Sequence, residues 1–131
     1  MPPRRIFSGS PFEAEIGYAR AVVAGGFVFI SGTTGFDYAT MTIAPGAAAQ
    51  AEQALRNIGA ALAEAGCGFQ DVVRVRYILP DRADFPACLP VLRRYFGADP
   101  PAATMIEARL LDERMRIEIE ATAMAPDRSK L

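Results

Sequence analysis

The stretch that decides the fold is Pro101-Ala-Ala-Thr-Met-Ile-Glu-Ala-Arg-Leu-Leu-Asp-Glu-Arg-Met-Arg-Ile-Glu-Ile-Glu-Ala-Thr-Ala123. Its pattern predicts two strands joined by a tight polar turn at Asp112-Glu113. In the second strand apolar and polar residues alternate strictly, which is typical of a strand with one apolar face. The apolar face carries Met115, Ile117 and Ile119, and the other face carries Arg116, Glu118, Glu120 and Thr122.

Two carboxylates therefore share one face of this strand. At the usual rise per residue, Glu118 and Glu120 lie about 7 Å apart. They repel each other unless cations or protons lie between them. The fold must supply neighbours for this pair, and the place where it does so is the best candidate for a site.

Two helices are predicted upstream, one from about Pro45 to Ala65 and one from about Phe85 to Phe96. Pro suits a first helical turn, and a glycine follows each predicted end, at Gly66 and Gly97. Apolar residues spaced three and four apart predict the buried stripes. These are Ala51, Leu55, Ile58, Leu62 and Ala65 on the first helix, and Leu89, Leu92 and Phe96 on the second.

The remaining periodic segments predict strands. Residues 4–7 form a short edge strand, and Ile16–Val23 and Phe27–Ser31 form a hairpin around two glycines. The nearly continuous apolar run Phe27–Ile30 predicts a strand covered on both faces. In residues 71–79 one predicted face is apolar and the other basic. The apolar face has Val73, Val75, Tyr77 and Leu79, and the basic face has Arg74 and Arg76.

The resulting order is β-ββ-α-β-α-ββ, which predicts an α+β fold with one mixed sheet and both helices on one face. Residues 1–131 fit a single domain, and residues 126–131 are expected to form a frayed tail. The uncovered sheet face carries arginines and glutamates with apolar residues between them. It is either a solvated face or, as we infer from the many apolar residues, covered by another copy of the chain, with ligand clefts between subunits.

Composition excludes several classes of function. The net charge of −1 gives no general attraction to nucleic acid or to anionic membranes. There is no apolar run long enough to cross a bilayer and no signal-peptide core, so a cytoplasmic location is expected. The chain has no histidine, and Cys67 and Cys88 lack metal-ligand spacing, so we expect no metal site. Each cysteine is interpreted as a free thiol, because a catalytic one would need an activating cation.

The turn Ser31-Gly-Thr-Thr-Gly35 is rich in glycine and hydroxyl groups. It lacks the Gly-Lys-Ser/Thr ending of a phosphate-binding P-loop. It is either an ordinary turn at the end of a strand or a loop whose N–H and hydroxyl groups bind an anionic ligand group.

Seven short motifs, in order along nearly the whole chain, resemble the Rid (YjgF) family. They are Gly17-Tyr18 with Ala21-Val-Val-Ala-Gly-Gly-Phe-Val-Phe-Ile-Ser-Gly32, Gln50…Gln53-Ala-Leu-Arg-Asn-Ile58, Ala65-Gly66, Asp71-Val-Val-Arg74, Leu79…Asp84-Phe85, Pro101-Ala102 and Ile117-Glu-Ile-Glu-Ala121. The resemblance implies a chorismate-mutase-like fold and a homotrimer with a ligand cleft at each subunit interface. It also implies hydrolysis of reactive enamines and imines to a carbonyl compound and ammonia, without metal or cofactor.

By this resemblance, Glu118 positions or activates the attacking water, and Tyr18 and the Ser31-Gly32 turn complete the cleft. The family's arginine that grips the substrate carboxylate is missing, because Ala103 occupies its place in Pro101-Ala-Ala-Thr104. Such a bidentate clamp is a strong contact, so its loss predicts an altered substrate. We expect the substrate-binding residues to be Ser31, Gly32, Thr33, Ala103, Thr104, Arg74, Arg76 and Glu120, with the Phe36-Asp-Tyr38 segment as a further candidate.

Three hypotheses follow from these residues. The first is an imine or enamine hydrolase in which Arg74, Arg76 or another subunit's arginine replaces the lost clamp. The second is a trimer that binds a small carboxylate or aromatic ligand without turning it over. The third is a protein-interaction or holdase module that uses the trimer surface.

Overall fold

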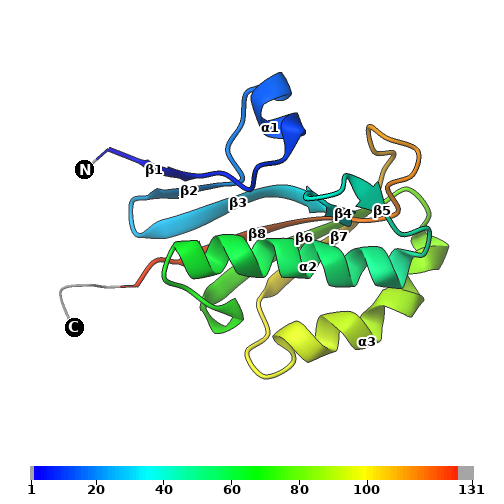
Figure 1. Cartoon of the computed structure of the whole chain (residues 1–131). Helices are drawn as coiled ribbons and strands as arrows, with labels where there is room; N and C mark the ends of the chain where they lie inside the picture. The colour runs from blue at the N-terminus through cyan, green and yellow to red at the C-terminus, as the bar shows by residue number, and fades with distance from the viewer. Residues whose placement is uncertain (1, 127–131) are drawn as a thin grey trace.

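A computed structural model describes residues 2–126 of the chain. A six-stranded sheet carries two long helices on one face, and a short helix lies on the other side (Figure 1). The elements in chain order are β1 (Arg4–Ile6), α1 (Pro11–Ile16), β2 (Ala21–Ala24), β3 (Phe27–Thr34), β4 (Phe36–Asp37), β5 (Thr42–Ile43), α2 (Ala47–Glu64), β6 (Val72–Leu79), α3 (Phe85–Phe96), β7 (Ala102–Glu107) and β8 (Glu118–Met124).

The strands of the large sheet lie in the order β1-β2-β3-β8-β6-β7. β6 and β7 are parallel and every other neighbouring pair is antiparallel, so the sheet is mixed as predicted. β4 and β5 form a separate small ribbon. The predicted fold class and the placement of α2 and α3 on one face are confirmed. Residues 127–131, where most of the expected frayed tail falls, lie outside the described part of the chain.

The predicted hairpin at the end of the chain is wrong. β7 and β8 are not neighbours, because β6 lies between them, and residues 108–117 form a long loop in place of a tight turn. The inward side chains of β8 and of the residue before it are all buried, which suits a strand paired on both edges. Most of β7 is exposed, which suits an edge strand. Burial therefore decided the strand order against the local turn signal.

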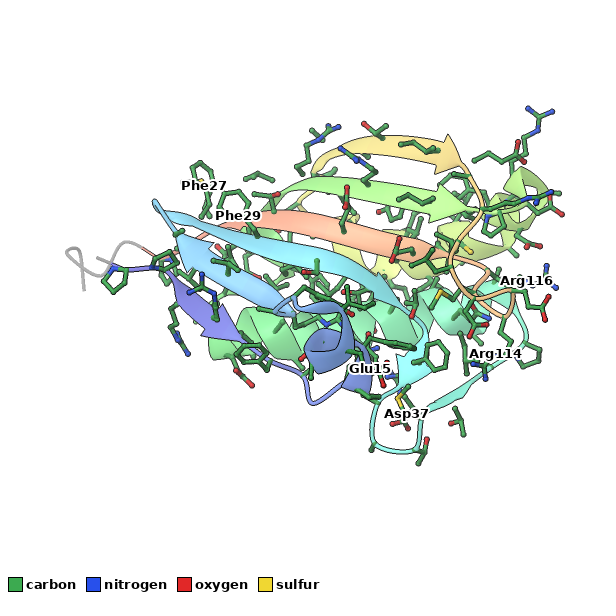
Figure 2. The ribbon with its side chains drawn as sticks, turned by 90° about the horizontal axis from the view of Figure 1, so that it is seen from above. Glu15, Phe27, Phe29, Asp37, Arg114 and Arg116 are labelled. Carbon is green, nitrogen blue, oxygen red and sulfur yellow. The ribbon has the colours of Figure 1, made fainter. Side chains whose placement is uncertain are left out.

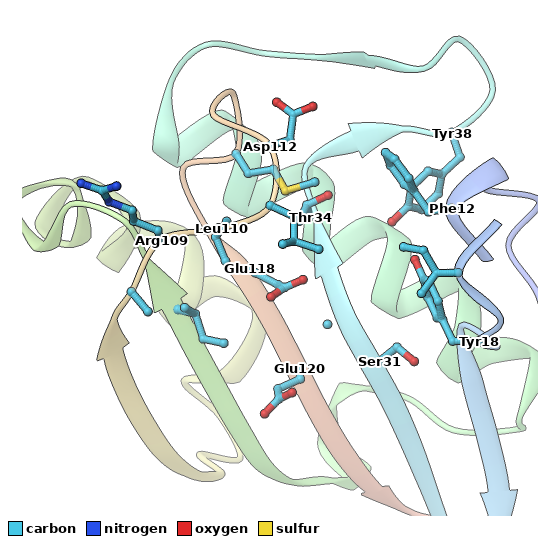
Figure 3. Close-up of a pocket in the computed structure, with 16 residues that line it drawn as sticks. Phe12, Tyr18, Ser31, Thr34, Tyr38, Arg109, Leu110, Asp112, Glu118 and Glu120 are labelled. Carbon is cyan, nitrogen blue, oxygen red and sulfur yellow. The ribbon is translucent and has the colours of Figure 1, made fainter. Parts of the chain in front are cut away.

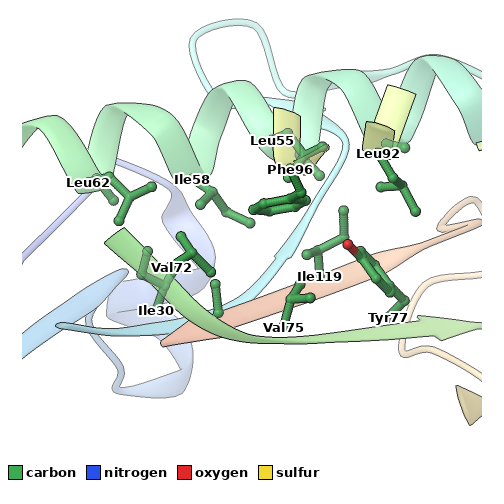
Figure 4. Packing of buried hydrophobic residues seen from close by; sticks show 14 of the residues in the cluster. Ile30, Leu55, Ile58, Leu62, Val72, Val75, Tyr77, Leu92, Phe96 and Ile119 are labelled. Carbon is green, nitrogen blue, oxygen red and sulfur yellow. The ribbon is translucent and has the colours of Figure 1, made fainter. Parts of the chain in front are cut away.

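The core lies between the sheet and the two long helices (Figure 4). Leu55, Ile58 and Leu62 point from α2 toward the sheet, as the predicted stripe requires. On α3 the stripe is partly different, because Leu89 is 36% exposed while Cys88, Val91, Leu92 and Phe96 are buried. Full burial of such a side chain contributes roughly 1.5–3 kcal/mol to folding, so these contacts hold the layers together.

Two irregularities in strand pairing change which side chains face the core. Between Val72 and Arg74, the pairing of β6 with β8 shifts. As a result Val72 is buried and Val73 is exposed, which corrects the predicted face for Val73. Between Ile30 and Thr33, the pairing of β3 with β8 shifts in the same way, and Ser31 and Gly32 form a β-bulge.

The expected strand from Ile16 is also wrong at its start, because residues 11–16 form helix α1. The Ser10 side chain accepts a hydrogen bond from the backbone N–H of Phe12, and Pro11 stands at the first helical position. Gly17, at φ 91°, ends the helix in the left-handed region, where glycine is favoured. The strand begins only at Ala21.

The open face of the sheet is apolar at one end. Figure 2 shows Phe27 and Phe29 projecting from the end of β3, and Phe27 pairs across the sheet with exposed Met124. Within the single chain this strand is therefore covered on one face only, since Val28 and Ile30 are buried and Phe29 is 48% exposed.

Candidate functional site

A cleft of about 700 Å³ opens on the face of the sheet opposite α2 and α3 (Figure 3). Its floor comes from β3 and β8, one wall from α1 and the segment that precedes β2, and the other wall from the loop 108–117. The lining is mostly aromatic and aliphatic around a few polar groups. It consists of Phe12, Ile16, Tyr18, Ser31, Gly32, Thr34, Tyr38, Ile78, Ala108, Arg109, Leu110, Leu111, Asp112, Met115, Glu118 and Glu120.

Glu118 and Glu120 lie on β8, at the floor of the cleft (Figure 3). Burial raises the pKa of Glu118 above its ordinary value of 4.5, and Glu120 raises it further while Arg20 lowers it. Glu120 instead forms an ion pair with Arg76 on the neighbouring strand, at 2.9 Å. The fold thus gives the two carboxylates different neighbours, which is typical of sites that handle protons.

Gly32 brings the backbone of β3 against Glu118. A Cβ at this position would lie 2.7 Å from both Cδ and Oε1 of Glu118, which is closer than atoms pack. The bulge at Ser31-Gly32 therefore leaves room for the carboxylate only because residue 32 has no side chain. The Ser31 hydroxyl donates to the carbonyl of Ala19 at 2.7 Å, so its oxygen can accept a hydrogen bond from the cleft.

A buried ion pair lies behind the Tyr18 wall. The Nε of Arg20 lies 3.3 Å from Oε2 of Glu13, and the two side chains are 1% and 4% exposed. The Glu13 carboxylate also accepts hydrogen bonds from the backbone N–H and the hydroxyl of Ser8. The guanidinium packs against the rings of Tyr18 and Tyr38, with its Cζ 5.4 and 5.0 Å from the ring centroids.

The other wall is tied to helix α2 by Gln50, which is fully buried. Its Nε2 donates to the carbonyls of Ala44 and Arg114, and its Oε1 accepts from the N–H of Arg116 at 2.7 Å. At the tip of the loop, hydrogen bonds from the Arg114 side chain and then its backbone lower the pKa of Asp112 to about 2. Asp112 is therefore ionised at neutral pH.

The structure brings together five of the predicted site residues in this cleft: Tyr18, Ser31, Gly32, Glu118 and Glu120. Tyr38, from the polar segment named as a further candidate, lines it as well. Thr33 does not, because the bulge turns it toward the core, where its hydroxyl accepts from Arg20 at 3.0 Å. Thr34 takes its place on the cleft side.

The remaining predicted residues lie elsewhere on the single chain. Arg74 and Arg76 line a second hollow of about 260 Å³ beside Glu120, farther along the open face. Thr104 accepts a hydrogen bond from Arg74 at 2.6 Å, and Ala103 is exposed on edge strand β7 opposite Val75. Arg76 lies directly opposite Glu120 of β8, which explains the ion pair between them.

Sequence reasoning missed the α1 contribution, the Arg20–Glu13 pair and the wall at Arg109–Leu111. The signal for α1 was present, as Ser10-Pro11 before and Gly17 after a short apolar pattern. No local signal identifies Arg20 and Glu13 as buried, since charged residues are almost never buried unless paired. Their pairing depends on how α1 folds back over the sheet.

Neither thiol is activated. Burial raises the pKa of Cys67 and of Cys88, and nearby Asp71 and Asp84, respectively, raise them further. Within residues 2–126, no three or more of the possible Cys, Asp or Glu ligands are grouped so as to hold a metal ion. The chemistry available in the cleft is therefore that of a half-buried carboxylate, tyrosine hydroxyls and backbone groups among apolar walls.

Comparison with known proteins finds similarity over almost the whole chain. The family described as "Endoribonuclease L-PSP" matches residues 9–125. The 2-iminobutanoate/2-iminopropanoate deaminase of Capra hircus is 40% identical over 123 residues, which cover 92% of this chain and 90% of that protein. The protein of the same name from Homo sapiens is 36% identical over the same shares of the two chains.

Solved structures agree with the fold. The Mycobacterium tuberculosis protein Rv2704, described as a member of the YjgF/YER057c/UK114 family, superimposes with a TM-score of 0.85 at 36% identity, covering 94% of this chain and 99% of that one. RidA from an Antarctic Psychrobacter has a TM-score of 0.78 at 35% identity, covering 82% and 88%. Among the described residues, no helix has the length and apolar character needed to cross a membrane.

Proposed function

The chain belongs to the YjgF (Rid) family, and from that premise we propose that it hydrolyses reactive imines or enamines to a carbonyl compound and ammonia. The observation that carries this proposal is the half-buried Glu118, which has a raised pKa and faces Tyr18 across an apolar cleft. A carboxylate whose pKa lies nearer neutrality is a better proton acceptor and donor at physiological pH. Relatives named as iminobutanoate deaminases, at 36–40% identity, support the same chemistry.

The proposed reaction needs only water and these side chains. The water oxygen bonds to the imine carbon as Glu118 takes a proton from it, and Glu118 returns this proton to the nitrogen, which has received the electron pair of the C=N bond. The same carboxylate then carries the proton of the new hydroxyl to the amine. The C–N bond breaks with its electron pair on nitrogen, a C=O bond forms, and ammonia leaves. Tyr18 hydrogen-bonds the substrate throughout.

The substrate we propose lacks an α-carboxylate and carries an apolar or aromatic group. Among the described residues that line the cleft, the charged ones are three carboxylates and Arg109, which lies on the rim and points away from Glu118 (Figure 3). Arg20 donates hydrogen bonds to four protein groups and is not free to grip an anion. A substrate carboxylate beside Glu118 would therefore lack a cation from this chain, which is costly in a half-buried site.

A homotrimer with the small-molecule clefts at its subunit interfaces is part of the proposal. The open sheet face carries exposed Phe27, Phe29, Val73 and Met124, and a large exposed apolar patch commonly marks an interaction site. β7 is an edge strand with exposed Met105 and Ile106. Ala103 lies on that edge, outside the chain's own cleft, so a clamp at this position could act only on a neighbouring subunit's cleft.

The test is hydrolysis of two imines generated in place by oxidases. One is 2-iminobutanoate, and the other is the carboxylate-free imine of benzaldehyde, made from benzylamine. We expect faster loss of the benzaldehyde imine with the protein than without it and a smaller effect on 2-iminobutanoate. Both effects should be strongly reduced in Glu118→Gln.

Two outcomes would contradict the proposal. If the protein accelerated the hydrolysis of 2-iminobutanoate more than that of the benzaldehyde imine, the altered substrate would be rejected. No acceleration of either imine, together with a melting temperature raised by benzaldehyde or 2-oxobutanoate, would instead indicate a protein that binds such ligands without turnover.

A further inference from the structure

Arg20 uses its guanidinium to join three parts of the cleft. Nε donates to Glu13 of α1, at 3.3 Å. Nη1 donates to the carbonyl of Gly32 and to the hydroxyl of Thr33, both at 3.0 Å, which holds the β3 bulge. Nη2 donates to Oη of Tyr18 at 3.2 Å. Helix, bulge and tyrosine are therefore held in one arrangement by a single buried side chain.

We propose that Arg20 is a positioning residue that makes the Tyr18 hydroxyl a hydrogen-bond donor to the molecule in the cleft. A guanidinium can only donate, whereas a tyrosine hydroxyl has one hydrogen to donate and lone pairs with which to accept. Because Arg20 donates to Oη, the hydroxyl hydrogen of Tyr18 must point to another acceptor. Tyr18 lines the cleft, so that acceptor is the ligand (Figure 3).

Glu13 keeps this arrangement in place. A buried guanidinium without a counter-ion would be strongly destabilising, and Glu13 supplies the counter-ion from an equally buried position. Arg20 is 1% exposed and packs against the rings of Tyr18 and Tyr38, which line the cleft while Arg20 does not. Its charge is therefore not available to bind an anion in the cleft directly. Arg20 therefore acts on the ligand through Tyr18.

This arrangement gives two groups of the cleft opposite roles, one as an acceptor and the other as a donor. The Glu118 carboxylate accepts a proton, while Tyr18, polarised by the cation behind it, donates a hydrogen bond to an atom with a lone pair. In the hydrolysis proposed above, on which this role rests, that atom is the imine nitrogen or the carbonyl oxygen of the product. Donation to nitrogen stabilises the electron pair that nitrogen receives when water adds.

The test is a double-mutant cycle of Tyr18→Phe and Arg20→Lys, assayed on the imine of benzaldehyde. If Arg20 acts through the Tyr18 hydroxyl, each single variant should lower kcat about 10- to 100-fold, the range expected for one strong hydrogen bond, with KM changed less. In the Tyr18→Phe background only the contacts of Arg20 with Glu13 and the β3 bulge remain to be lost. Arg20→Lys should therefore lower kcat by a smaller factor there than in the wild-type background, and the difference should exceed the roughly twofold scatter of independent effects. Losses that multiply would overturn the proposal.

Two controls keep a folding defect from imitating this result. Tyr95→Phe removes a hydroxyl on α3, where the ring packs on Phe69, and should show no coupling to Arg20→Lys. If Arg20→Lys does not fold, the pair Glu13→Gln with Arg20→Gln removes both buried charges together and serves in the same cycle.

Benzaldehyde binding to the same four proteins separates this inference from the proposed function. Its carbonyl oxygen can only accept a hydrogen bond. If Tyr18 is the donor, benzaldehyde binding should weaken non-additively in the two variants. Coupled binding without any hydrolysis would reject the proposed function and retain this inference. Hydrolysis with multiplicative losses would support the proposed function and reject this inference. The absence of both coupled binding and coupled hydrolysis would also overturn the inference.

Discussion

At the scale of single residues, the environment of Glu118 determines what the cleft can do. The carboxylate is half-buried, and the charged groups around it are Glu120 on the same strand, Arg20 behind the tyrosine wall, and Asp112 and Arg109 on the loop. Burial and Glu120 raise its pKa, and Arg20 opposes them without cancelling the shift. Glu118 therefore takes up a proton more readily than an ordinary glutamate does.

This environment predicts the pH dependence of activity. As the proton acceptor, Glu118 must be ionised, so kcat/KM should fall as the pH decreases through an apparent pKa above 4.5. Glu118→Gln should retain only a low activity that lacks this limb. The measurement is the pH–rate profile of both proteins, and the same limb in the Gln variant would assign it to another group.

The stability of the fold should depend on the ionisation of Glu118 in the opposite direction. Between the ordinary pKa of 4.5 and the raised value, the folded chain binds the Glu118 proton more tightly than the unfolded chain does. The contribution of Glu118 to the free energy of unfolding therefore decreases as the pH rises through that window. Urea titrations at a series of pH values should show that the free energy of unfolding of the wild type falls relative to that of Glu118→Gln as the pH rises through this window.

At the scale of elements, the bulge of β3 is what makes room for Glu118. Ser31 and Gly32 occupy the space opposite Glu120, and this shift turns Thr33 into the core and Thr34 toward the cleft. The Arg20 bonds to Gly32 and Thr33 hold the bulge in this form. A regular strand would reverse the facing of these threonines and move the backbone that borders the carboxylate.

Gly32→Ala tests the role of the bulge. The new Cβ would meet Cδ and Oε1 of Glu118 at 2.7 Å, so the carboxylate must move. A displacement of about 1 Å in a reacting group lowers activity by about 100-fold. Because the clash falls on the end of a flexible side chain, the melting temperature should change little.

The matched control is Gly46→Ala, at a position with ordinary φ and nothing within 4 Å of an added Cβ. We expect it to keep full activity and to lose at most about 1 kcal/mol of stability from the cap of α2. Equal activity in the two alanine variants would show that the position of Glu118 is not critical.

At the scale of the whole molecule, the open face of the sheet exposes several large apolar side chains in the single chain. Phe27 and Phe29 lie in contact, with ring centroids 5.9 Å apart, next to Met124 on the neighbouring strand. Arg76 and Glu120 form their ion pair farther along the same face. An apolar patch beside a charged hollow suits an interface that is partly dry and partly polar.

Phe29→Glu tests the proposed trimer. We expect the wild-type protein to sediment at three times its chain mass of 14.1 kDa and Phe29→Glu to sediment at the mass of one chain, because a charge on this patch opposes burial. Phe7→Glu is the control, since Phe7 is 57% exposed but lies beside α2, on the other side of the sheet. A wild-type monomer at micromolar concentration would reject the trimer and the interfacial cleft.

Local patterns in the sequence predicted the sheet and helix layers and placed the carboxylate of Glu118 on the open face. The alternation around Ile117 and Ile119 predicted which face of β8 is buried, the helical spacing from Leu55 to Leu62 predicted the face of α2, and Glu118 was placed on the open face. These inferences hold because periods of two and 3.6 residues are set by the backbone of each segment alone. Resemblance added Tyr18 and the Ser31-Gly32 turn, which lie in the same cleft.

Only the tertiary structure decided the strand order, the facing of Val73 and Thr33, and the burial of Arg20 with Glu13. Each depends on contacts between segments that are far apart in the sequence. The periodicity of a single segment does not predict such contacts. A bulge reverses every later side chain of its strand, and β6 was inserted between β7 and β8 because the more buried strand takes the centre of the sheet. A charged pair becomes buried only when α1 folds over the sheet and gives each charge its partner.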